Sequence, residues 1–132
     1  MLYLGDLQGA RSHYERALAI DEQAVDPDHP DVAVAISNLG GVLQELGDLQ
    51  GAKAHFERAL AIDEQVFGPD HPDVAIRVSN LGSVLQDLGD LQGAKAYYER
   101  AFTIRRKFLG EEHPKTVTTK RNLEWAIRLL ER

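Results

Sequence analysis

Three histidines recur at 42-residue intervals in the links between expected helices: His29, His71 and His113. Histidine is a common metal ligand, so a regular row of histidines raises the question of a metal site. Equivalent atoms of stacked helical hairpins lie about 10 Å apart, whereas two histidines on one zinc ion each place a nitrogen about 2 Å from it. The spacing argues against a metal site, and we expect each histidine to cap or pack the helix start that follows it.

The sequence carries no pattern typical of a catalytic or cofactor-binding site. A Ser, His and Asp set, a Gly-rich phosphate loop after a strand and a His-Glu-x-x-His helix are all absent from the 132 residues. With 15 Lys and Arg against 21 Asp and Glu, the formal charge is −6, which disfavours a nucleic-acid partner. The chain has no cysteine and no long apolar run. We therefore expect a cytoplasmic, non-enzymatic protein without cofactor or membrane partner.

An internal repeat determines the elements that position every other side chain. Residues 5–46 return as residues 47–88, and only 11 of the 42 aligned positions differ. A third copy begins at Gly89 and diverges after about Arg105. We expect one array over residues 1–132, made of a half repeat (1–29), two repeats (30–71 and 72–113) and a terminal helix or cap (114–132).

Each copy contains two helices, because apolar residues recur three and four positions apart and stop signals fall between them. The first helix, called A, begins at Pro30, Pro72 or Pro114 and ends at Gly47 or Gly89. The second helix, called B, is expected to be N-capped by Asp6, Asp48 or Asp90 and to end near Phe67 or Leu109. The sequence thus predicts an all-α solenoid of about six helices in antiparallel hairpins.

The apolar and small residues of these hairpins follow one recurring order. In the first full copy they are Ile36, Leu39, Gly40, Leu43, Ala52, Phe56 and Ala59, and in the second Val78, Leu81, Gly82, Leu85, Ala94, Tyr98 and Ala101. This order resembles the tetratricopeptide repeat family. The period and the Gly-Pro-Asp-His-Pro-Asp link resemble its kinesin light chain subtype. The resemblance implies a binding module for a protein or peptide, with Asn at the position of Asn38, Asn80 and Asn122 in the peptide groove.

The exposed side of the A helices is predicted to form that groove. The alternative is that the asparagines only bond to a neighbouring helix. An amide side chain can donate to and accept from an extended peptide backbone. The candidate groove residues are Val34, Ser37, Asn38, Gly41 and Gln44 in the first full copy, Ile76, Ser79, Asn80, Ser83 and Gln86 in the second, and Arg121, Asn122 and Trp125 in the last helix.

The two ends of the array suggest a second function. The first B helix, expected over Leu7–Val25, lacks its own A helix, and the last A helix has no B helix after it and carries Glu124 in place of the recurring glycine. Unpartnered apolar faces favour self-association, either between N-terminal halves or head to tail. The candidate residues are Leu7, Ala10, Tyr14, Leu123 and Ile127. Two alternatives remain open: the chain is a fragment of a longer array, or it is the sensor array of a larger signalling protein.

Overall fold

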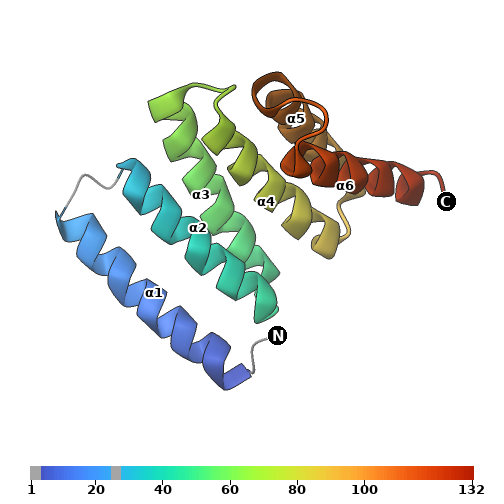
Figure 1. Ribbon diagram of the computed structural model, residues 1–132. Coiled ribbons are helices and arrows are strands. Elements are labelled where there is room, and N and C mark those ends of the chain that lie inside the picture. Colours follow the sequence, from blue (N-terminus) through green and yellow to red (C-terminus); the bar gives the residue numbers. More distant parts are fainter. Residues whose placement is uncertain (1–3, 25–27) are drawn as a thin grey trace. The chain divides into compact units, whose positions relative to one another are not determined.

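Six α-helices make up the part of the chain that the structure describes, residues 4–24 and 28–132 of a computed structural model (Figure 1). They are α1 (Leu4–Ala24), α2 (Pro30–Glu45), α3 (Leu49–Phe67), α4 (Pro72–Leu88), α5 (Leu91–Leu109) and α6 (Pro114–Leu130). No strand occurs in these ranges, which confirms the predicted all-α helical repeat. None of the described helices is long and apolar enough to span a bilayer. The chain divides into two compact units, Met1–Val66 and Phe67–Arg132.

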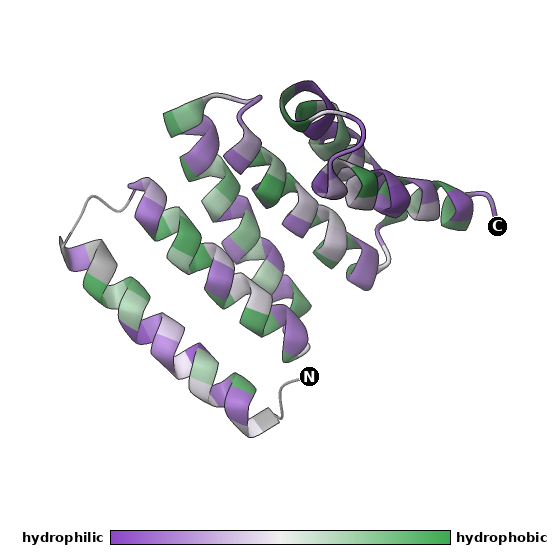
Figure 2. Ribbon diagram, viewed as in Figure 1, coloured by the Kyte–Doolittle hydropathy of each residue, from purple (hydrophilic) through white to green (hydrophobic). Residues whose placement is uncertain are grey.

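The N-terminal unit holds a hydrophobic cluster between its helices. α1 packs against α2, and α2 packs against α3. The buried members of the cluster are Val32, Ala33 and Ile36 of α2 with Ala59 and Ile62 of α3, and Leu18 of α1 packs against them. Hydrophobic and hydrophilic residues alternate along every helix in Figure 2, as expected for helices with one buried face.

The C-terminal unit repeats this packing with α4, α5 and α6. α5 contacts both α4 and α6. Its core cluster combines Leu85 of α4, Ala94 and Tyr98 of α5, and Ala126 of α6. Leu88, Tyr97 and Leu123 pack around this cluster. One B helix is therefore covered by its own A helix and by the next one.

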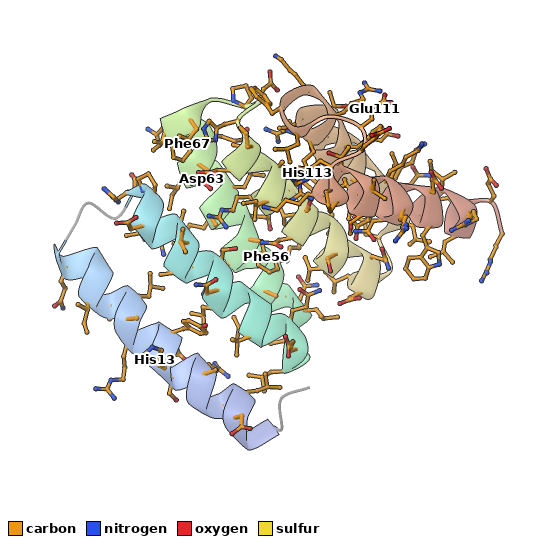
Figure 3. The ribbon with its side chains drawn as sticks, in the orientation of Figure 1. His13, Phe56, Asp63, Phe67, Glu111 and His113 are labelled. Atoms are coloured by element: carbon orange, nitrogen blue, oxygen red, sulfur yellow. The ribbon has the colours of Figure 1, made fainter. Side chains whose placement is uncertain are left out.

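The three A helices begin in the same way. The Nδ1 atoms of His29, His71 and His113 accept hydrogen bonds from the backbone N–H two residues later, at 3.1, 3.0 and 3.1 Å. Each histidine has an extended backbone and is followed by a proline at the first helical position. The predicted capping role of the histidines is confirmed, and His113 marks the start of α6 in Figure 3.

The A and B helices are joined by a tight turn at a left-handed glycine. Gly47 has φ of 90° and Gly89 has φ of 87°, a conformation that strains any residue with a Cβ atom. The next residue in each case, Asp48 or Asp90, donates its N–H to the carbonyl oxygen of Leu43 or Leu85 at 2.8 Å. The two turns therefore share the same glycine conformation and the same closing hydrogen bond.

Asp48 and Asp90 cap the B helices that follow, as predicted. Their Oδ1 atoms accept from the N–H groups of Gly51 and Gly93, both at 2.9 Å. The prediction for Asp6 was wrong, because α1 begins at Leu4 and Asp6 lies inside its first turn, where its charge favours the helix dipole. The predicted end of this helix, Val25, lies outside the described residues.

A glycine in the A helix allows close approach of an aromatic ring from the B helix. A Cβ atom added to Gly40 would lie 2.8 Å from Cε1 of Phe56, and one added to Gly82 would lie 2.6 Å from Cε1 of Tyr98. Phe56 lies on α3, beside α2, in Figure 3. Both rings are buried. The recurring glycine is therefore a packing residue, which offsets its low helix propensity.

Candidate functional site

The exposed face of α6 carries the largest polar and aromatic side chains among the predicted groove residues. Arg121, Asn122 and Trp125 are all exposed. They lie within one turn of each other, on one face of the helix. Thr119 and Ala126 are buried, so α6 has one packed side and one open side. Trp125 is 45% exposed, which is unusual for so large an apolar side chain.

The predicted groove residues of α4 are less open than those of α6. Ile76, Ser79, Asn80, Ser83 and Gln86 are all half-buried. The Oε1 atom of Gln86 accepts a hydrogen bond from the hydroxyl of Tyr98 at 3.2 Å, so Gln86 also supports the hairpin. The hydroxyl of Ser79 is buried, with no hydrogen-bond partner within the described part of the chain. α4 therefore offers a mixed apolar and amide surface.

In the N-terminal unit, α2 presents four of its five predicted groove residues at least partly to solvent. Val34 and Asn38 are exposed, and Gly41 and Gln44 are half-buried. Ser37 is buried, so the expectation that it lines an exposed surface was wrong. The reason is helical geometry: Ser37 lies one turn after Ala33 and one turn before Gly40, and both of these face the core.

The residues predicted for self-association differ in their burial. Leu7 was expected on an unpartnered face but is buried, because α1 has a packing partner in α2. Ala10 and Tyr14 are half-buried, as are Leu123 and Ile127. Leu123 packs against the core cluster of the C-terminal unit. Self-association through these residues stays a prediction.

Burial shifts the pKa of two side chains in the C-terminal unit. Burial, and then the negative charge of Asp87, raise the pKa of Tyr98 to about 12. Burial lowers the pKa of Arg105, whose Nη1 atom donates to Oγ1 of Thr119 at 2.7 Å. This hydrogen bond between α5 and α6 was not predicted, because Arg105 and Thr119 both differ from the residues at the equivalent positions 42 residues earlier. No group of three metal-ligating side chains occurs within the described ranges.

The recurring helical hairpins are similar to those of known proteins. A family model for the tetratricopeptide repeat matches residues 1–65, 31–77 and 75–132. The chain belongs to the tetratricopeptide repeat family. Tetratricopeptide repeats generally mediate protein–protein interaction, and the fold is typically a non-catalytic scaffold. No curated protein sequence gives a significant match.

Solved structures place this tetratricopeptide chain near kinesin light chain-like proteins. A kinesin light chain candidate from Podosopora anserina, with nearly identical TPR-like repeats, has a TM-score of 0.88 and 26% identity over 94% of this chain and 59% of its own. BtubC (BKLC) from P. vanneervenii also has a TM-score of 0.88 and 26% identity, over 96% of this chain and 51% of its own. The chain thus spans between 51% and 59% of the length of these two relatives.

Proposed function

We propose that the exposed surface of α4 and α6 binds an extended peptide or a segment of another protein. The observation that carries the proposal is the exposed Trp125, with Arg121 and Asn122 on the same face of α6. Trp and Arg are among the residue types most enriched at binding hot spots. An indole offers a large rigid contact area, and a guanidinium and an amide beside it can fix the direction of a bound backbone.

The surface of α4 supports the same proposal with different chemistry. Half-buried Ile76 offers apolar contact, and Asn80 offers an amide that can both donate and accept. Partly buried positions of this kind lose little side-chain entropy on binding, because their neighbours already restrict them. Tetratricopeptide repeats generally mediate protein–protein interaction, which favours a protein partner over a small molecule. A regulatory role within a larger signalling protein stays a prediction.

Peptides selected from a random display library provide the test. Peptides would be selected on the wild-type chain, and their dissociation constants measured by fluorescence anisotropy for the chain and its variants. Trp125→Ala should weaken binding by roughly ten- to thirtyfold, about 1.4–2 kcal/mol, as expected for a hot spot. Asn80→Ala should weaken it by a smaller factor without changing the far-UV circular dichroism spectrum.

Phe108→Ala is the matched control, because Phe108 is a comparably exposed aromatic residue at the end of α5, a helix that is not part of the proposed surface. It should leave the dissociation constant unchanged. Equal losses for Trp125→Ala and Phe108→Ala would show that the peptides recognise exposed aromatic residues in general, and no loss for Trp125→Ala would rule out this surface.

A further inference from the structure

Two links between helices lie at the same end of the C-terminal unit. α4 and α5 pack against each other as a hairpin that turns at Gly89, so the start of α4 lies at the same end as the close of α5, where the link to α6 begins (Figure 1). A hydrogen bond of 3.1 Å from Nη2 of Arg100 to the carbonyl oxygen of Pro69 holds the first link on α5. This surface, formed by residues 67–73 and 106–115, is called here the link end.

The link end exposes three large apolar side chains. Phe67, labelled at the end of α3 in Figure 3, is 37% exposed although its ring stacks on His71 at 4.4 Å between centroids. Phe108 and Leu109, at the end of α5, are 50% and 36% exposed. Each link joins two described helices, so these side chains stay open although the helices on both sides are in place. Large apolar side chains gathered on one surface are typical of an interface.

The two equivalent stretches of the repeat that meet here differ in the sign of their charge. Residues 64–73 contain three acidic residues and no lysine or arginine, whereas residues 106–115 contain three basic and two acidic residues. The three basic residues are Arg106, Lys107 and Lys115, which stand 42 positions after Glu64, Gln65 and Asp73. The same place in the repeat is therefore acidic before α4 and basic before α6.

The cations of the link end lie on aromatic rings rather than on carboxylates. Arg106 lies 5.2 Å from the ring centre of Phe102, and the ammonium group of Lys107 lies 5.3 Å from that of Phe108. Both cations are exposed, and so is Asp70 on the first link. None of the three makes an ion pair with another residue in the part of the chain that the structure describes. The link end thus has a basic half and an acidic half, each with an exposed aromatic ring.

We propose that the link end binds the link end of a second copy of this chain, with the acidic half of each copy against the basic half of the other. A two-fold axis brings the two halves together twice in such a contact, so the surface is complementary to itself. The contact covers Phe67 and Phe108, and the opposite charges fix its register. It shares no residue with the proposed surface of α4 and α6 or with the self-association candidates taken from the sequence.

Sedimentation equilibrium of the full chain tests this association. The average mass should rise from 14.7 kDa toward twice that value as the concentration is raised from about 10 μM to about 1 mM, as for a small and transient contact. Salt should weaken the dimer, because it screens the exposed charges. Phe108→Ala should raise the dissociation constant of the dimer by about tenfold, and Trp125→Ala should leave it unchanged. These effects are the reverse of those expected for peptide binding, so the two proposals can fail separately.

Charge reversal identifies the surface that the two copies share. Asp70→Lys and Lys107→Glu should each raise the dissociation constant by at least about tenfold, because each places like charges opposite one another. An equimolar mixture of these two variants should dimerise again, because every opposed pair is then of opposite sign. Arg128→Glu is the matched control: it makes the same change of charge as Lys107→Glu in the last turn of α6, about 20 Å along that helix from the link end, and should have no effect. Far-UV circular dichroism checks that each variant folds.

Four results would overturn the proposal. The first is a monomer at about 1 mM chain. The second is a dimer that neither Asp70→Lys nor Lys107→Glu weakens, which would place the contact elsewhere. The third is a mixture of these two variants that stays monomeric, because the acidic and basic halves would then not face each other. The fourth is equal weakening by Arg128→Glu and Lys107→Glu, which would reflect the net charge of the chain alone.

Discussion

At the scale of single residues, histidine replaces the Ser, Thr, Asp or Asn that usually caps a helix. The imidazole Nδ1 atom of His113 accepts from the N–H of Lys115 at 3.1 Å, so the ring nitrogen takes the place of a side-chain oxygen. The same geometry at His29 and His71 means that the row of histidines serves three separate helix starts.

The first prediction follows from this cap. His113→Ala should lower the free energy of unfolding by about 1 kcal/mol, because the N–H of Lys115 loses its acceptor. His113→Asn should recover most of this loss, since asparagine is among the best capping residues. Urea unfolding followed by Trp125 fluorescence measures both, because Trp125 is the only tryptophan and lies in the same unit. Equal losses for Ala and Asn would mean that the ring acts through packing.

The buried phenol of Tyr98 gives the second prediction. Its pKa is about 12 in the folded chain, against 10.0 for an ordinary tyrosine. The folded state therefore favours the neutral phenol, and this contribution is complete below about pH 10 and is lost as the pH rises to about 12. The loss should be on the order of 2 kcal/mol.

Unfolding of the Tyr98→Phe variant should accordingly depend less on pH between about 10 and 12 than unfolding of the wild type. Tyr97→Phe is the control, because it removes the neighbouring phenol, which is only half-buried. Parallel pH profiles for the wild type and Tyr98→Phe would show that another group causes the alkaline loss of stability.

At the scale of elements, the fit of glycine to aromatic ring gives the third prediction. Gly40→Ala should destabilise the N-terminal unit by about 1–3 kcal/mol, because the new methyl group would meet the buried ring of Phe56. Gly41→Ala adds the same methyl group next to it, where a Cβ atom meets nothing within 4 Å, and should stabilise α2 by up to about 1 kcal/mol. Urea unfolding followed by far-UV circular dichroism compares the two, and stabilisation by Gly40→Ala would contradict the packing role.

Most helix boundaries could be predicted from the sequence, because local signals set them. The prolines after the histidines, the left-handed glycines and the capping aspartates all act within a few residues of the chain. The predicted start of α1 was wrong. The repeat predicted a cap at Asp6, but no local signal prevents the helix from beginning at Leu4.

The candidate site was harder to predict, because exposure depends on packing between helices. Ser37 and Leu7 are buried although the repeat pattern assigned one to a groove and the other to an open face. The hydrogen bond from Arg105 to Thr119 depends on two substitutions in separate helices, and neither is informative alone. Position in the repeat predicts which element a residue occupies better than it predicts what surrounds its side chain.

At the scale of the whole molecule, the chain is a tetratricopeptide array, and repeats of this family generally mediate protein–protein interaction. The proposed surface of α4 and α6 combines polar side chains with the half-buried Ile76 and the exposed Trp125.

The most direct test of the central claim uses Trp125 as its own reporter. Increasing amounts of a selected peptide would be added to the wild-type chain while the emission of its single tryptophan is recorded. Binding on the α4 and α6 surface should transfer the 45% exposed indole out of water, so the emission should shift to shorter wavelength. The shift should saturate, and its midpoint should give the same dissociation constant as anisotropy. Saturable binding without any change in tryptophan emission would contradict the proposed surface.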